Sequence, residues 1–328
     1  MTDLATNPGQ PHLGRRLRRL MADQPMIPLI VLLLVLCAIL QVLTPGIISP
    51  LWIANTVKFA IPLALLAGAQ TLTMLTGGLD LSVGTVGTMA AFIMATQIGH
   101  HDPATTLALS MLPAVLIGLA NGVGVGIFRV HPLIMTLGTG LVGSGILQVY
   151  QRTVIATGSE IPGFIVWLGT GLTYGVPNAL LLFVPLATLI IFVLRRTGFG
   201  RQVYAIGDNE KAARLSGSSY WQVILTLYVT SSLLAGIAGL LYVGVIRTPS
   251  LTLVDPLVLP SVAATIIGGT SIFGGRGTYS TAILGALILR VLTTLLTVLQ
   301  MPEGVRQGLF GLVILVVTAV YLRIIEDR

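Results

Sequence analysis

The chain has 328 residues, of which 54% are hydrophobic and only 9% are charged, and its formal net charge is +7. Soluble domains carry about 25% charged residues, so this composition excludes a soluble globular protein and indicates an integral membrane protein. The apolar runs are too long and continuous for barrel strands, which alternate over about 10 residues. We therefore predict an all-α polytopic membrane protein.

About ten stretches of the chain are apolar and long enough to cross a bilayer, for which a helix needs roughly 20 residues. They fall near residues 26–44, 55–76, 82–99, 105–127, 132–150, 176–194, 222–246, 257–273, 279–299 and 305–322. The first run is as long as a full span and no small-residue cleavage site follows it, which favours a membrane helix over a signal peptide. We expect one transmembrane domain over residues 25–323, with tails over 1–24 and 324–328.

The positive charge follows the expected topology. With the N-terminus in the cytoplasm, the inside segments hold 13 of the 18 Lys and Arg residues and the outside ends hold four, while Arg290 lies within a span. This bias is the positive-inside rule, and an even number of spans puts both termini in the cytoplasm. The net charge therefore favours membrane topology over nucleic-acid binding.

Two connecting segments are longer than the others. The outside segment 151–175 contains Gly, Pro, Trp and Tyr, which suits an interfacial hairpin or short helix rather than a span. The inside segment 195–221 is the most polar stretch after the N-terminus. A cytoplasmic loop of this size indicates that the segment has a function.

Residues 209–216, "NEKAARLS", predict a two-turn helix within this inside loop. Asp208 or Asn209 can accept hydrogen bonds from the first N–H groups of the helix. Glu210 lies at the positive end of the helix dipole, and Gly217 can end the helix in a left-handed cap.

The same short helix carries Ala212 and Ala213, which leave a small and nearly flat patch that another protein's groove can approach closely. Two turns are too few to be stable alone, which favours docking on a partner. A surface loop with a chance helical turn is the alternative interpretation.

Four ordered motifs together resemble the membrane subunit of bacterial sugar ABC importers of the ribose, xylose and galactose type. They are "GGLDLSVG" at 77–84, "AIGDNEKAARLSG" at 205–217, "SSLLAGIAGLLYVGVIRTPS" at 231–250 and "AATIIGGTSIFGGRGTYSTAILGALI" at 263–288. The resemblance extends from about residue 55 to residue 322.

This resemblance implies a type II importer permease of about ten helices in the bacterial inner membrane. It implies a second permease subunit, identical or different, a periplasmic sugar-binding protein and a cytoplasmic ABC ATPase, with segment 209–217 as the coupling helix in the ATPase cleft. The chain has no G-x-x-x-x-G-K-[ST] phosphate loop. We therefore expect ATP and Mg to be used by the partner, with no cofactor and no enzymatic activity in this chain.

Glycine-rich segments at two inside junctions predict the translocation path. Residues 77–88, "GGLDLSVGTVGT", and 268–279, "GGTSIFGGRGTY", form a weak internal sequence repeat. Glycine-rich segments in corresponding positions of two halves of a chain point to a transport pathway. The candidates for the pathway or gate are Gly77, Gly78, Asp80, Ser82, Gly268, Gly269 and Arg290.

Asp80 and Arg290 are the two unusual charges. We expect Asp80 at the inner end of the second span, where it either caps the third helix or takes part in the sugar path, with Ser82 as a further cap. We expect Arg290 about 16 Å along its helix, near the bilayer midplane. There it faces the pathway or a partner helix, or extends outwards.

The chain differs from the family's sequence pattern at one place, and several alternative functions stay open. Members of the family commonly place an acidic pair where this chain has Val258, Leu259 and Pro260, which weakens any inference about the particular sugar. The same architecture also suits an autoinducer-type signal, a polyol or a nucleoside. An ion-coupled secondary transporter lacks the usual intramembrane relay, because the four His residues fall in loops or tails. An intramembrane enzyme lacks a nucleophile with a base, and a single cysteine, Cys37, argues against a metal site.

Overall fold

The computed structural model describes residues 26–154, 159–302, 304–309, 311–312 and 315. The predicted tails, 1–24 and 324–328, and most of the predicted span 305–322 lie outside these residues. The elements in chain order are α2 (Met26–Leu43), α3 (Pro50–Met74), α4 (Val83–Gln97), α5 (Pro103–Gly126), α6 (Pro132–Val154), α7 (Gly163–Thr170), β1 (Leu172–Thr173), β2 (Val176–Pro177), α8 (Leu180–Arg196), α9 (Gly198–Asp208), α10 (Glu210–Leu215), α11 (Tyr220–Ile246), the 3-10 turn η2 (Asp255–Leu257), α12 (Val258–Ile267) and α13 (Tyr279–Val298).

The all-α polytopic class is confirmed, and the structure refines the number of full spans. In the described part of the chain six helices, α2, α3, α5, α6, α11 and α13, are long and apolar enough to cross a membrane, and α8 with α9 makes a seventh if this pair, bent by 69°, is one span.

Two of the predicted spans, 82–99 and 257–273, are shorter than expected. Helix α4 has 15 residues and α12 has 10, so they extend only about 22 and 15 Å against roughly 30 Å of hydrocarbon. Helix α12 ends because Gly269 adopts a φ of +82° and the Thr270 N–H bonds the Thr265 carbonyl, 3.1 Å away, which is a Schellman cap.

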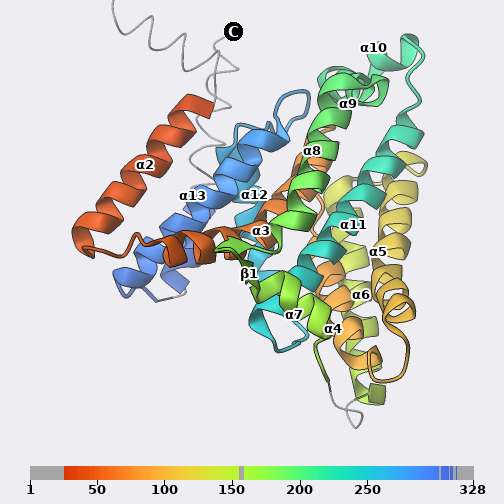
Figure 1. Ribbon diagram of the computed structural model, residues 1–328. Helices are drawn as coiled ribbons and strands as arrows, with labels where there is room; N and C mark the ends of the chain where they lie inside the picture. The colour runs from red at the N-terminus through yellow and green to blue at the C-terminus, as the bar shows by residue number, and fades with distance from the viewer. Residues whose placement is uncertain (1–25, 155–158, 303, 310, 313–314, 316–328) are drawn as a thin grey trace, which may run out of the picture.

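Both long connecting segments fold as short elements. Segment 151–175 and the two residues that follow it contain α7 and the antiparallel hairpin β1–β2, in which Leu172 pairs with Pro177, so both a short helix and a hairpin are present. Segment 195–221 contains the predicted two-turn helix α10, preceded by a further helix, α9, that was not predicted. Helices α9 and α10 lie together at one end of the bundle, and α7 lies toward the other (Figure 1).

Helix α11 forms the centre of the bundle and packs against α3, α4, α5 and α7. Close contact depends on small residues, since helices in lipid associate through packing of their backbones. A Cβ atom at Gly239 of α11 would lie 2.0 Å from the carbonyl oxygen of Gly87 on α4. The two helices therefore touch through their backbones at this level.

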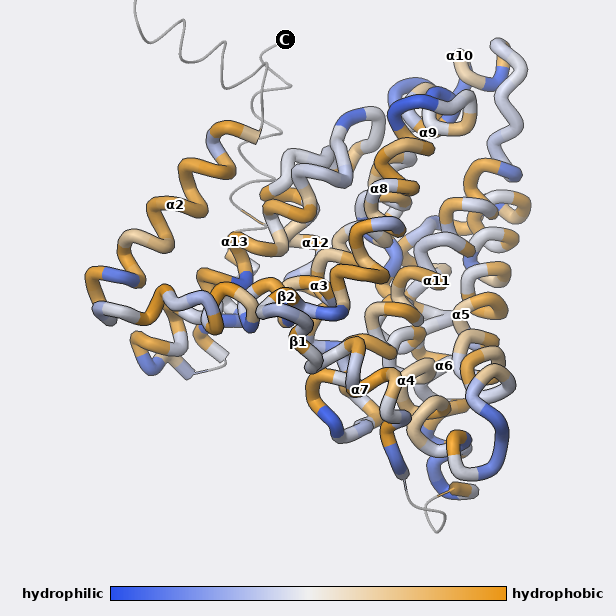
Figure 2. The backbone as a smooth tube through the Cα atoms, viewed as in Figure 1, coloured by the Kyte–Doolittle hydropathy of each residue, from blue (hydrophilic) through white to orange (hydrophobic). Residues whose placement is uncertain are grey.

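The outer surface of the bundle is apolar between two polar ends. Helix α2 packs along α13 and leaves large side chains such as Val42 and Leu34 exposed by 79% and 62%. Figure 2 shows hydrophobic residues along the helices and hydrophilic residues around α9 and α10 and in the turns at the opposite end. This distribution fits a protein that crosses a membrane with α9 and α10 in water.

Candidate functional site

The segment between α3 and α4 turns back into the bundle instead of staying at its end. Gly77 has a φ of +75°, a conformation that favours glycine, and reverses the chain after α3. A Cβ atom at Gly78 would lie 2.6 Å from the Tyr228 hydroxyl oxygen, so a larger residue at this point would displace the Tyr228 side chain. The two glycines allow residues 78–82, which we call the re-entrant segment, to run between the helices.

Asp80 lies in the middle of this re-entrant segment and is fully buried. Its Oδ1 accepts hydrogen bonds from the Ser82 N–H (3.1 Å) and the Ser82 hydroxyl (2.5 Å), and its Oδ2 accepts from the Ser231 hydroxyl (2.8 Å). Ser231 is about 16 Å along α11 from Tyr220. Gln70, which bonds the Asp80 backbone, is only four residues from the end of α3 at Met74. Asp80 therefore lies beside the end of the second span, where it was expected, and is turned inward against α11.

The expected cap at the start of α4 differs in detail. Ser82 is the residue before α4, but its hydroxyl makes no capping bond to the helix. The hydroxyl donates to Asp80 and accepts from the Asn121 amide on α5 at 2.9 Å, and the Asn121 carbonyl oxygen accepts from Thr139 on α6 at 2.6 Å. The side chain that was expected to cap a helix instead connects three helices.

Two further polar residues hold the backbone of the re-entrant segment. Gln70 on α3 donates to the Asp80 carbonyl at 2.7 Å and accepts from the Asp80 N–H at 3.3 Å. Thr136 on α6 accepts from the Leu81 N–H at 3.1 Å. Within the described residues no Lys, Arg or His forms an ion pair with Asp80, so the carboxylate is satisfied by the Ser82 and Ser231 hydroxyls and the Ser82 N–H.

We call these side chains the Asp80 network: Gln70, Asp80, Ser82, Asn121, Thr136, Thr139 and Ser231. Of these residues, only Asp80 and Ser82 were predicted from the sequence, where charges and glycine-rich segments indicated them. A buried neutral polar side chain within an apolar span is the signal that indicates the other members. In the structure of the single chain Asp80 has no exposed surface, so its part in a sugar path stays a prediction.

The second glycine-rich segment meets the first in space. Gly268 ends α12, Gly269 takes the left-handed conformation, and the Gly275 N–H bonds the Leu75 carbonyl at 2.9 Å. A Cβ atom at Gly274 would lie 3.0 Å from the backbone nitrogen of Gly77. The two segments that resemble each other in sequence are therefore in direct backbone contact.

Arg290 lies apart from the Asp80 network. Its guanidinium is 4.5 Å from the centre of the Phe59 ring on α3, a cation–π distance, and its Nε has no hydrogen-bond partner. Phe59 and Gln70 are 11 residues apart on the same helix, or about 16 Å. Arg290 therefore does not line the same site as Asp80.

Helix α10 has both of the predicted caps. Asn209 Oδ1 accepts from the Ala212 N–H at 3.1 Å, which resolves the choice between residues 208 and 209. Gly217 has a φ of +86°, its N–H bonds the Arg214 carbonyl at 3.0 Å, and the Ser218 N–H bonds the Ala213 carbonyl at 3.0 Å. These two bonds form a Schellman motif.

The flat patch expected at Ala212 and Ala213 is only half present. Ala212 is exposed, but Ala213 is 4% exposed and packs into the hydrophobic core. The most exposed apolar side chain of the helix is Leu215, at 91%. The surface that α10 offers to a partner is therefore built around Leu215 and Ala212.

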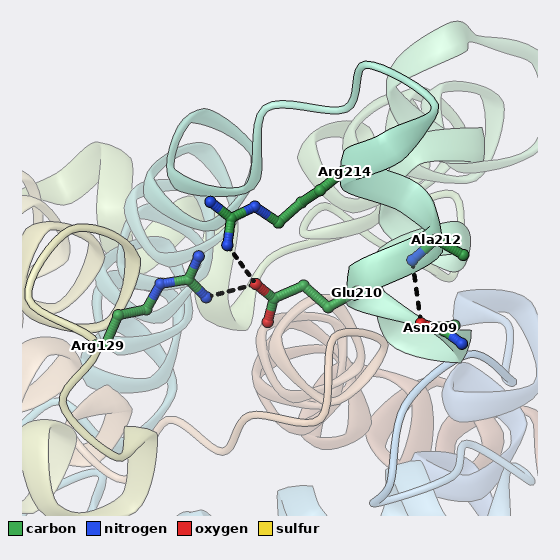
Figure 3. A network of polar contacts seen from close by, with 5 residues as sticks. All are labelled: Arg129, Asn209, Glu210, Ala212 and Arg214. Atoms are coloured by element: carbon green, nitrogen blue, oxygen red, sulfur yellow. Dashed lines mark hydrogen bonds and ion pairs between the residues drawn. The ribbon is translucent and has the colours of Figure 1, made fainter.

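Glu210 attaches α10 to the turn between α5 and α6. Its Oε1 lies 2.7 Å from Arg129 Nη1 and 3.7 Å from the nearest nitrogen of Arg214, and both arginines point toward it from different segments (Figure 3). The Arg129 guanidinium also stacks 3.6 Å from the centre of the Tyr220 ring. This contact joins the start of α6, the start of α10 and the start of α11.

The fold and these sites define a multi-pass membrane permease. The chain belongs to the family described as the branched-chain amino acid transport system / permease component, whose model matches residues 52–318.

Several characterised permeases are similar to it along most of their length. The ribose import permease protein RbsC of Bacillus subtilis (strain 168) is 31% identical over 285 residues, or 87% of this chain and 88% of RbsC. The fructose import permease protein FrcC of Rhizobium meliloti is 31% identical, covering 90% of this chain and 84% of FrcC. The galactofuranose transporter permease protein YtfT of Escherichia coli (strain K12) is 33% identical, covering 83% and 79%. No solved structure matches the chain.

Proposed function

We propose that the chain is the permease subunit of an ABC importer that moves a monosaccharide from a periplasmic binding protein into the cytoplasm. The similar permeases are named for ribose, fructose and galactofuranose, which supports a pentose or hexose as cargo. The observation that supports this function most strongly within the molecule is α10, a helix of six residues that is capped at both ends and exposes Leu215.

The proposal assigns α10 to the ATPase. A short capped helix keeps its shape when it moves, and an exposed leucine at its end suits an apolar cleft in a partner protein. The basic residues near the α9 and α10 end support a cytoplasmic position for it. In this arrangement the partner ATPase uses ATP and Mg, and a second permease subunit completes the pathway.

Substitution of Leu215 tests this assignment. Leu215→Asp places a charge in the proposed apolar contact and should abolish sugar-stimulated ATP hydrolysis in the reconstituted complex, whereas Leu215→Met keeps an apolar side chain and should retain it. Because Leu215 is 91% exposed, neither change disturbs the core of the permease. Ala213, the other residue of the predicted patch, is unsuitable for this test. Because its side chain is buried, Ala213→Arg would disturb the packing of the permease itself.

Uptake of labelled ribose, fructose and galactose into proteoliposomes that hold the complete complex tests the cargo and the energy source. We expect uptake of one of these sugars to require both ATP and the binding protein. Full uptake by Leu215→Asp would exclude α10 as the coupling helix. Uptake without ATP that follows an ion gradient would favour the secondary transporter instead.

A further inference from the structure

A polar pocket lies between the end of α5 and the start of α11, beside α10. Its volume is about 470 Å³, and its lining residues are Gly126, Ile127, Arg129, Arg214, Ser218, Ser219, Tyr220 and Trp221. Two of these residues are basic and none is acidic. The Glu210 carboxylate, which lies outside the lining and contacts both arginines, offsets one of the two positive charges. The remaining charge of +1 and the size of the pocket suit a small anionic group.

The two arginines reach the pocket from separate segments and stay accessible. Arg129 comes from the α5–α6 turn with a φ of +59°, a conformation that few residues other than glycine adopt, and its guanidinium is fixed against the Tyr220 ring. Arg214 comes from α10. Their side chains are 41% and 61% exposed, and a guanidinium carries five N–H donors in the geometry that suits phosphate.

The start of α11 adds further donors on the same side. The first N–H groups of a helix have no partner within the helix, and the side chain of the N-cap residue Ser219 makes no capping bond. These groups also lie at the positive end of the dipole of a 27-residue helix. An anion in the pocket would therefore meet two guanidiniums and a helix N-terminus.

The position of the pocket indicates where its anion comes from. Helices α5 and α11 both reach their polar end at this level, and the lining residues Ile127 and Trp221 are 53% and 45% exposed. Tryptophan is enriched at membrane–water interfaces, and basic pockets between transmembrane helices on the cytoplasmic side bind lipid headgroups. We propose that the pocket binds the phosphate headgroup of an anionic phospholipid, with Arg129 and Arg214 on the phosphate and the acyl chains beside Ile127 and Trp221.

Glu210 competes with this headgroup for the same arginines. Its Oε1 lies 2.7 Å from Arg129 Nη1, yet Glu210 does not line the pocket. A phosphate in the pocket therefore weakens the attachment of α10 to the α5–α6 turn. Conversely, the loss of the Glu210 charge frees both guanidiniums for the lipid.

Quenching of Trp221 fluorescence by brominated lipids tests the proposal. The chain has three tryptophans, so Trp52→Phe and Trp167→Phe leave Trp221 as the single probe. The full-length permease is placed in phosphatidylcholine nanodiscs that contain equal fractions of either brominated phosphatidylglycerol or brominated phosphatidylcholine. We expect stronger quenching by the brominated phosphatidylglycerol.

Three variants define the site. Arg129→Gln with Arg214→Gln should reduce the selectivity for phosphatidylglycerol roughly 25-fold, since each basic residue near an anionic surface contributes about 1 kcal/mol, or fivefold. Glu210→Gln should increase it. Arg196→Gln with Arg201→Gln, which removes the same charge from exposed positions elsewhere on α8 and α9, should leave it unchanged.

Four results would overturn the proposal. They are equal quenching by the two lipids, an unchanged selectivity in the double variant of the pocket, displacement of the lipid by inorganic phosphate at matched ionic strength, and loss of the selectivity when the ATPase binds. The third result would assign the pocket to free phosphate, and the fourth would assign it to the ATPase interface.

Discussion

Ser231 and Ser232 are consecutive buried residues of α11 that differ in their hydrogen bonds. The Ser231 hydroxyl donates to Asp80 Oδ2 at 2.8 Å, whereas the Ser232 hydroxyl has no hydrogen-bond partner. Both residues are fully buried. Substitution of either one by alanine removes the same atom at nearly the same depth, but only one of the two changes breaks the Asp80 network.

The two changes should affect the free energy of unfolding differently. A hydrogen bond to a charged group contributes about 1.5–3 kcal/mol, so Ser231→Ala should lower the free energy of unfolding by about 2 kcal/mol. Ser232→Ala removes an unpaired buried hydroxyl, which itself costs free energy, and should be neutral or slightly stabilising.

Changes at Asp80 extend the series. Asp80→Ala removes the acceptor of three hydrogen bonds and should cost more than Ser231→Ala, by at least about 3 kcal/mol in total because buried donors are left unpaired. Asp80→Asn should cost less, because the amide oxygen still accepts from Ser82 and the amide nitrogen can donate to the Ser231 hydroxyl.

Thermal unfolding of the purified full-length permease in detergent measures these differences. The double variant Asp80→Ala/Ser231→Ala should lose less stability than the sum of the single variants, by about 1–3 kcal/mol. Equal shifts for Ser231→Ala and Ser232→Ala, or an additive double variant, would refute the network as a source of stability.

Sugar uptake by Asp80→Asn separates the two roles of the carboxylate: retained uptake fits a structural junction, and lost uptake in a stable protein fits a charge-dependent gate.

Three further outcomes are expected. Gly78→Ala should destabilise the permease by about 1–3 kcal/mol through its contact with the Tyr228 hydroxyl, and Tyr228→Phe in the same chain should restore most of the loss in thermal unfolding. Gly217→Ala should speed hydrogen exchange in α10, because the φ of +86° at residue 217 is strained for alanine. No atom lies within 4 Å of the new Cβ, so the backbone strain is the only expected effect. Unchanged exchange would contradict the role of Gly217 as the cap. Arg290→Leu should keep sugar uptake, because Arg290 contacts the Phe59 ring rather than the Asp80 network. Loss of uptake in a folded variant would instead show that Arg290 takes part in the translocation pathway.

The elements that the sequence predicted correctly are those that depend on local chemistry. Helix α10 is one example: Asn209 and Gly217 each act within four residues of their own position, so the pattern alone defines the helix. The interfacial elements between residues 159 and 177 are another. Long apolar runs likewise predicted the full spans, because length and composition determine whether a helix can cross a membrane.

The missed features depend on contacts between distant residues. Nothing near Ala213 in the sequence indicates that it packs into the core while Ala212 does not. The Asp80 carboxylate accepts a hydrogen bond from Ser231, which is 151 residues away. The short length of α12 has a local cause in Gly269, but the preceding apolar run concealed it.

The arrangement of α6 explains how the two candidate sites are connected. Helix α6 begins at Pro132, only three residues after Arg129, whose guanidinium holds Glu210 at the start of α10. One turn later Thr136 holds the backbone of the re-entrant segment. Seven residues along the chain therefore separate the contact with α10 from the contact with the re-entrant segment, and α6 is the covalent link between the two candidate sites.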